Sequence, residues 1–177
     1  MRHSLEHEVR WSRRVVTPAD AVRFIDAVGY CLLFPIKNLP LPSLYYAVAR
    51  RQPITWDSYT ENIWEWKGSL GRQRRAFYTK CFKGRGTFIS LKLLPHFLAM
   101  CDSAANISAD ARAIWEALAE HGPLATLELR HACKMESKAG NARFKRAMAE
   151  LQCLLLVFYA GVEQETAAWP SGRFELT

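Results

Sequence analysis

The sequence predicts a mostly α-helical protein with small β wings, arranged as tandem winged-helix units of which the carboxyl-terminal one is the more regular. Three observations carry this prediction. Apolar residues recur with the period of a helix over 109–121 and 138–152. An apolar run at 154–159 precedes a turn-rich segment and a second strand signal at 173–176. A short strand signal at 87–89, next to a glycine turn, repeats part of this order in the first half.

The first half opens with a charged arm, residues 1–16, which carries one large anchor, Trp11. Thr17 then precedes a proline and an acidic first turn, which is a strong helix start, and Gly29 ends that helix. The segment 30–42 is apolar and punctuated by prolines, so it predicts a packed, irregular connection.

Ser43 is placed to cap a short helix that runs to Arg50, and 53–61 follows as a loop. The segment 63–83 predicts a further helix with a break at its glycines. Ser90 is expected to cap a helix over 91–101. The small, polar stretch 102–106 is the predicted boundary between domains 17–106 and 107–177.

In the second half, three helices and two strands follow in order. The first helix begins after Ser108 and stops at Gly122; the second spans 127–133 behind Thr126. The third begins after Ser137 and buries one apolar stripe, which is Phe144, Ala147, Met148 and Leu151. The strands at 154–159 and 173–176 close the unit, with a turn-rich arm between them.

The charge is distributed unevenly along this chain of 177 residues with a formal net charge of +7. Residues 1–106 hold sixteen Lys and Arg against eight Asp and Glu, whereas 107–177 hold eight against nine. A basic balance favours anionic partners, and the order helix, helix, helix, hairpin is typical of proteins that place a helix in the DNA major groove. The sequence therefore predicts binding to double-stranded DNA.

Two basic clusters are the candidate DNA-binding sites. The first is the densest charge in the chain: Arg72, Arg74, Arg75, Lys80, Lys83 and Arg85. The second lies on the third helix, with Lys138, Lys145 and Arg146 on the exposed face and Asn141 on its flank. Long basic side chains reach phosphates and guanine edges, and Asn141 suits adenine. We expect the first cluster to supply most of the affinity, because acids at 163–165 lie in the arm beside the third helix. The alternative is an ordinary solvated helix face.

Several classes of site are not indicated. The five cysteines are odd in number and form no Cys-x-x-Cys pair, which fits buried free thiols in a reducing cytoplasm. His131 and Cys133 have no second ligand pair at zinc spacing, so no metal is expected. No apolar run reaches the roughly 20 residues of a membrane span, and the start lacks a signal peptide. Phosphate-loop, Rossmann and nucleophile-elbow motifs are missing, so the sequence indicates neither cofactor nor catalytic residue.

The chain resembles the AlkZ-like group of bacterial winged-helix proteins, in particular the shorter AlkZ-related proteins. The resemblance covers most of 17–160 and rests on several stretches, which are 27–36, the Trp64-Glu65-Trp66-Lys67 run, 76–80 leading to 84–90, Leu94-Pro95-His96-Phe97, His121-Gly122-Pro123-Leu124 and Arg143-Phe144. It implies tandem winged helices and a role in DNA repair. Full glycosylases of the group excise alkylated or crosslinked bases with a Gln-x-Gln-type motif.

This chain lacks that motif. Leu32 and Phe34 occupy the places where the resemblance puts two polar catalytic residues, and neither can position a water. The leading hypothesis is therefore a winged-helix protein that binds duplex DNA without catalysis. A DNA glycosylase that uses another acid, such as Asp26 or Glu65, is the alternative. A winged-helix module that binds another protein is the second alternative.

Overall fold

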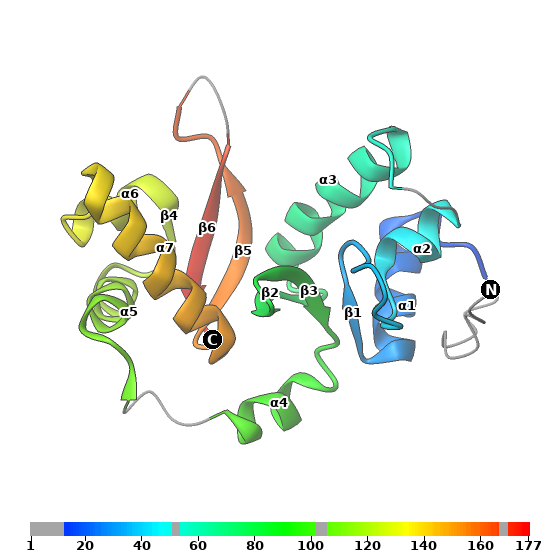
Figure 1. The fold of residues 1–177 in the computed structure, drawn as a ribbon, viewed down its shortest axis with the longest axis horizontal. Helices are drawn as coiled ribbons and strands as arrows, with labels where there is room; N and C mark the ends of the chain where they lie inside the picture. The colour runs from blue at the N-terminus through cyan, green and yellow to red at the C-terminus, as the bar shows by residue number, and fades with distance from the viewer. Residues whose placement is uncertain (1–12, 51–53, 102–105, 167–169) are drawn as a thin grey trace.

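The computed structural model describes residues 13–50, 54–101, 106–166 and 170–177. These residues form two units that share one element order, helix, strand, helix, helix, strand, strand (Figure 1). The first unit contains α1 (Pro18–Val28), β1 (Tyr30–Leu32), α2 (Leu44–Ala49), α3 (Ser58–Arg72), β2 (Phe77–Phe82) and β3 (Arg85–Ile89). After α4 (Leu94–Met100), the second contains α5 (Ala109–His121), β4 (Leu124–Ala125), α6 (Thr126–Ala132), α7 (Lys138–Cys153), β5 (Val157–Glu163) and β6 (Ser171–Leu176).

The predicted fold class, mostly α with tandem winged helices, is wrong. The described residues are 49% helical and 19% strand, a mixture of α and β with two small antiparallel sheets. The sheets have three strands each, in the orders β1-β3-β2 and β4-β6-β5. The largest single error is β2, which lies in the segment expected to continue the helix of 63–83. Its six residues include three aromatic rings, and such residues fit a pleated surface better than a helix.

Four helix starts follow the local signals, whereas α4 begins at Leu94, not directly after Ser90, and α3 begins at Ser58, inside the predicted loop. Thr17 and Asp20 form a reciprocal capping box at α1, and the side chains of Ser43, Ser108 and Ser137 accept backbone hydrogen bonds at α2, α5 and α7. At α6 the prediction shifts by one residue: the helix begins at Thr126 itself, where the Glu128 carboxylate accepts the N–H of the preceding residue at 2.9 Å.

The two units share apolar packing. One cluster of buried side chains combines Phe77 and Ile89 of the first sheet with Leu155 and Phe158 of the second unit. The rings of Phe77 and Phe158 lie 5.4 Å apart between centroids. A hydrogen bond from Thr79 Oγ1 to the carbonyl of Gln152, 2.8 Å, also joins β2 to α7 in the buried interior. The core therefore runs across the contact between the units.

The contact between α3 and β5 is closer still, because glycines face each other there. An added Cβ at Gly71 would lie 2.5 Å from the Tyr159 carbonyl oxygen, and one at Gly161 would lie 3.2 Å from the Gly68 carbonyl oxygen. Gly161 has φ +115°, a conformation that side-chain-bearing residues rarely adopt. This contact fixes α3 directly against β5.

The ends of the predicted domains are only partly described. Trp11 and most of the arm lie outside the described residues, as does most of the predicted boundary 102–106. Within the described part of the arm, Val15 is fully buried and its N–H bonds the carbonyl of Ala47 at 3.2 Å. The arm therefore packs onto α2 before α1 begins, and the domain division stays a prediction.

Candidate nucleic-acid interface

The β2–β3 hairpin presents three of the predicted cations. Lys80, Lys83 and Arg85 are exposed, and the seven residues 80–86 contain no acid. The hairpin turns at Lys83 and Gly84, both in the left-handed region, with φ +48° and +67°. Lys83 therefore extends into solvent from a two-residue turn, and Lys80 and Arg85 do so from the strands on either side of it.

The exposed face of α7 presents the second cluster. The predicted stripe of Phe144, Ala147, Met148 and Leu151 is buried, which confirms the orientation of the helix. Lys138, Lys145 and Arg146 are exposed and Asn141 is partly exposed. Residues 138–149 contain no acid either, and the next residue, Glu150, is held by the N–H and hydroxyl of Ser108 at 2.7 and 2.6 Å.

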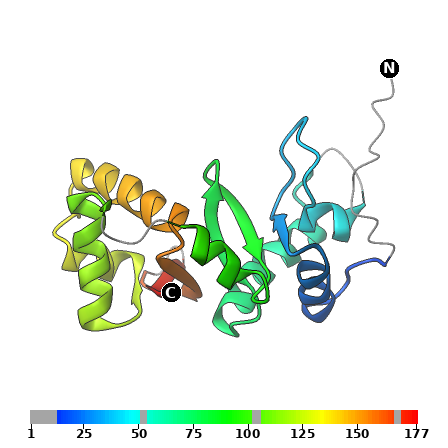
Figure 2. The ribbon, with the colours of Figure 1, turned by 90° about the horizontal axis from the view of Figure 1, so that it is seen from below.

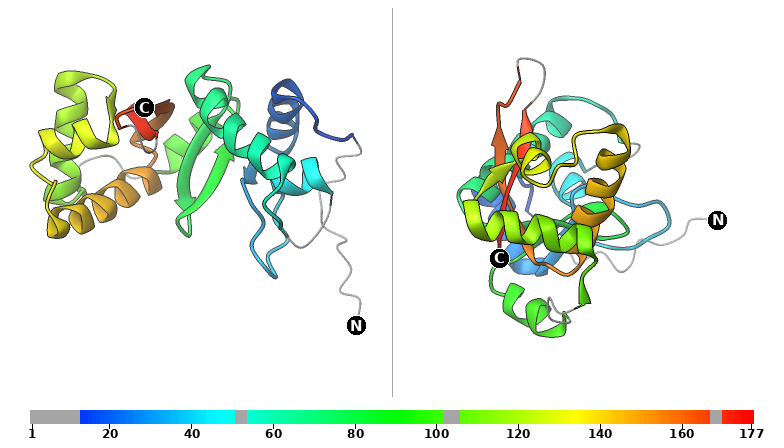
Figure 3. Two further views of the ribbon diagram at one scale, coloured as in Figure 1. Left: turned by 90° about the horizontal axis from the view of Figure 1, so that it is seen from above. Right: turned by 90° about the vertical axis from the view of Figure 1, so that its left-hand side faces the viewer.

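The structure brings these two basic segments together. The carboxyl-terminal end of α7 lies against β2 through the Thr79–Gln152 hydrogen bond, and Cys153 Sγ lies 3.7 Å from the Cys81 carbonyl oxygen. Figure 2 and the left view of Figure 3 show α7 and the turn of the hairpin on the same side of the molecule. We call this side, formed by 80–86 and the exposed residues of 138–149, the basic face.

The other half of the first cluster lies elsewhere. Arg72 ends α3, and Arg74 and Arg75 follow it, so β2, about 20 Å long at 3.3 Å per residue, separates these three from the hairpin turn. Arg74 Nη2 donates to Glu175 Oε2 on β6 at 3.0 Å; Glu175 Oε1 lies 2.8 Å away, out of line for a hydrogen bond. The six cations predicted as one cluster therefore divide into two groups, and Arg74 is already paired.

Arg143, on the flank of α7, is also paired. Its Nε donates to Asp110 Oδ2 on α5 at 3.0 Å. This hydrogen bond, more than the charge of Arg143 itself, lowers the pKa of Asp110, with partial desolvation acting in the opposite direction. Arg143 is therefore committed to the α5–α7 contact, whereas Lys138 and Lys145 have no such role in the described structure.

The acids between β5 and β6 are engaged within the second unit. Glu163 forms an ion pair with Arg173. The Glu165 carboxylate accepts the N–H groups of Leu127 and Glu128 at 2.9–3.0 Å, at the positive end of α6. From the sequence, we expected α7 to contribute less DNA affinity than the first cluster, because these acids would repel phosphates. Since both carboxylates are engaged within the protein, that reason for a smaller contribution is weakened.

The folded chain can now be compared with known proteins. The family described as AlkZ related matches residues 15–177. The chain belongs to the AlkZ-related family. The same comparisons find no similar curated protein and no similar solved structure.

In this AlkZ-related chain, the positions suggested for catalysis are structural. Leu32 is fully buried in β1 opposite Thr87, and Phe34 packs on Tyr45 with the ring centroids 6.0 Å apart. Of the alternative acids, Asp26 accepts a hydrogen bond from Ser90 Oγ at 2.8 Å and pairs with Lys92 at 3.3 Å. Its carboxylate is thus occupied within the first unit.

Among the described residues, no three His, Cys, Asp or Glu side chains gather as a metal site would require. His131 instead contacts Glu136, with 2.7 Å between Nδ1 and Oε1. No helix in the described part of the AlkZ-related chain is long and apolar enough to span a membrane.

Sequence reasoning missed one group, the Lys67 side chain. Its Nζ lies 4.0 Å from the ring centroid of Trp64, 5.1 Å from that of Tyr159 and 5.6 Å from that of Tyr78. Trp64 is close in sequence, three positions before Lys67 and so on the neighbouring turn of α3, but the tyrosines come from β2 and β5. No local sequence signal could have predicted that these three elements meet.

Proposed function

We propose that this AlkZ-related protein binds duplex DNA through the basic face, without excising a base. One observation carries the proposal: two acid-free basic segments, 80–86 and 138–149, lie on one side of the molecule, and the elements that carry them, β2 and α7, are joined by the buried Thr79–Gln152 hydrogen bond. Six of their cations form no ion pair among the described residues, namely Lys80, Lys83, Arg85, Lys138, Lys145 and Arg146. Phosphates are the partners such a surface suits.

The family assignment supports DNA as the ligand, since AlkZ-related proteins are named for their relation to a DNA-repair group. The buried Leu32 and packed Phe34 support binding without glycosylase chemistry, because neither can activate water or stabilise a cationic sugar. A positive face held rigid by packing between two units also fits a duplex better than a flexible tail would, because its phosphate contacts are pre-organised.

Fluorescence anisotropy with a labelled duplex, at several salt concentrations, tests the proposal. If the six unpaired cations each reach a phosphate, the slope of log K against log salt is roughly −5. If the protein does not bind the duplex at low salt, the proposal is refuted, and a module that binds another protein becomes the leading hypothesis. Release of an alkylated base from a matched duplex would instead support the glycosylase alternative.

Paired variants then locate the surface. Lys80→Ala with Lys83→Ala should weaken binding to every duplex equally and flatten the slope by about two phosphate equivalents. Lys138→Ala with Lys145→Ala should have a similar effect. Arg72→Ala with Arg75→Ala removes the same charge from the other end of β2 and serves as the control. If this control weakens binding most, the surface we propose is wrong and the original ranking of the two clusters holds.

A further inference from the structure

The Lys67 amine occupies an unusual place for a lysine, at the contact between the units. Its side chain is partly buried, and aromatic rings from α3, β2 and β5 surround its Nζ at 4.0–5.6 Å. Among the described residues, no carboxylate lies within ion-pair distance of it. The amine is therefore held by ring faces rather than by a counter-charge.

This environment favours the neutral amine. Burial, and after it the positive charge of Lys80 on β2, lowers the pKa of Lys67 to about 8, although the ring faces favour the ammonium form. Burial raises the pKa of Tyr159 to about 12 and that of Tyr78 further, so both phenols stay protonated beside the amine. Near pH 8, about half of the Lys67 side chains carry a free electron pair.

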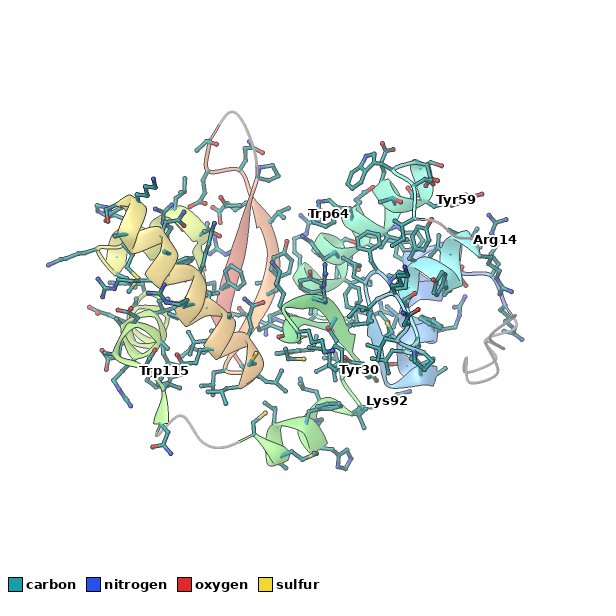
Figure 4. All side chains as sticks on the ribbon, in the orientation of Figure 1. Arg14, Tyr30, Tyr59, Trp64, Lys92 and Trp115 are labelled. Atoms are coloured by element: carbon teal, nitrogen blue, oxygen red, sulfur yellow. The ribbon has the colours of Figure 1, made fainter. Side chains whose placement is uncertain are left out.

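The Lys67 site is held firmly, and part of its lining is exposed to solvent. Gly71 and Gly161 hold α3 against β5, which fixes the distance from Lys67 to Tyr159. Trp64 is 49% exposed, and Val162, which lies 3.7 Å from a Cβ built on Gly68, is 43% exposed. Figure 4 shows Trp64 on the side of α3 that faces β5. One wall of the Lys67 site is thus an accessible aromatic face.

We propose that Lys67 is a nucleophile that forms an imine with the aldehyde of a base-less deoxyribose in DNA. The inference rests on the proposed function, because an abasic sugar in DNA can reach Lys67 only if the protein binds DNA. The amine nitrogen attacks the aldehyde carbon of the ring-opened sugar, giving a carbinolamine. A carbon–nitrogen double bond then forms as the carbon–oxygen bond breaks and one water leaves. The exposed ring of Trp64 offers a stacking surface to a base beside the missing one.

The test is reductive trapping. The full chain is mixed with a duplex that contains one abasic site, and sodium borohydride reduces any imine to a stable secondary amine. We expect one covalent adduct, assigned to Lys67 by peptide mapping, with a yield that rises through about pH 8. An unperturbed lysine would show the same rise only above about pH 10. Adducts spread over other lysines, or a rise only at that higher pH, would overturn the proposal.

Two variants supply the controls. Lys67→Arg keeps the positive charge but removes the amine, so the adduct should fall by about tenfold or more. Lys92→Arg, at an exposed lysine paired with Asp26, should trap as well as the wild type. Anisotropy with the same abasic duplex is measured for all three proteins and shows whether each variant is folded and bound.

These measurements separate the two proposals. Binding without a Lys67 adduct overturns the imine and leaves DNA binding intact. If the wild-type protein does not bind the abasic duplex, both the imine and the DNA-binding proposals are overturned. Binding by Lys67→Arg at wild-type affinity, together with loss of its adduct, assigns the chemistry to the Lys67 amine.

Discussion

Replacement of Gly71 by alanine tests the contact between α3 and β5. The Cβ added at Gly71 would lie 2.5 Å from the Tyr159 carbonyl oxygen and 3.3 Å from a Tyr159 ring carbon. The first distance is far below van der Waals contact, and its partner is backbone, so α3 and β5 must move apart. Gly68→Ala on the same helix is the matched control, because its Cβ would meet only Val162 side-chain carbons, at 3.7–3.9 Å.

The magnitudes follow from two opposing effects. Alanine is favoured over glycine inside a helix by about 1 kcal/mol, so Gly68→Ala should stabilise the protein by up to that amount. Gly71→Ala gains the same propensity but overpacks a buried contact, which typically costs about 1–3 kcal/mol. Because propensity cancels between the two variants, Gly71→Ala should unfold about 1–3 kcal/mol more easily than Gly68→Ala.

Urea unfolding followed by tryptophan fluorescence and by circular dichroism measures this difference directly. In thermal melts it corresponds to about 2–4 °C for each kcal/mol in a protein of this length. If Gly71→Ala proves as stable as Gly68→Ala, α3 and β5 do not pack as described, and the positions of Tyr159 and Lys67 derived from that packing are wrong.

Three further predictions concern stability and reactivity. Thr79→Val keeps shape but removes the hydrogen bond between the units, so urea unfolding should show a loss of about 1–2 kcal/mol; an unchanged midpoint would contradict a buried bond at this place. The hydrogen bond from the Thr17 hydroxyl, more than any other contact, lowers the pKa of Asp20 to about 2, so its stabilisation of α1 is present above pH 4 and disappears as the pH falls toward 2. Asp20→Asn should therefore be less stable than the wild type at pH 6, with the difference shrinking as the pH falls from 4 to 2, and a constant difference would refute this linkage. A thiol reagent should modify the exposed Cys153 in the native state and spare Cys31, whose pKa is raised by complete burial. Equal rates of modification at the two cysteines would mean that the hydrophobic core around Cys31 opens readily.

How much of the fold could be predicted depended on the range of the interactions. Helix starts depend on side chains within three residues, and the caps at Thr17, Ser43, Ser108 and Ser137 were all predicted correctly. The strands β1 and β4 have three and two residues, too few to show a periodic pattern. They exist because they pair with β3 and β6, which lie about fifty residues further along the chain.

The candidate site likewise has features that local sequence predicts and features that depend on long-range contacts. Exposure of Lys145 followed from charge and helical period, whereas exposure of Lys80, which lies on β2, followed from its charge alone. That the two lysines lie on the same side of the molecule depends on the contact between Thr79 and Gln152, which are 73 residues apart. No local sequence pattern encodes this contact. The pairing of Arg74 with Glu175, 101 residues away, likewise needed the folded chain. The sequence therefore identified the cations, and the fold determined which of them lie on the same side of the molecule.

The apolar cluster that crosses between the two units limits how this chain can be divided. A fragment that ends near residue 106 would expose Phe77 and Ile89 to water, and the complementary fragment would expose Leu155 and Phe158. Each half would then present an uncovered apolar surface next to a sheet, which is the usual starting point for aggregation. Genetic or proteolytic separation of the halves is therefore expected to give insoluble products.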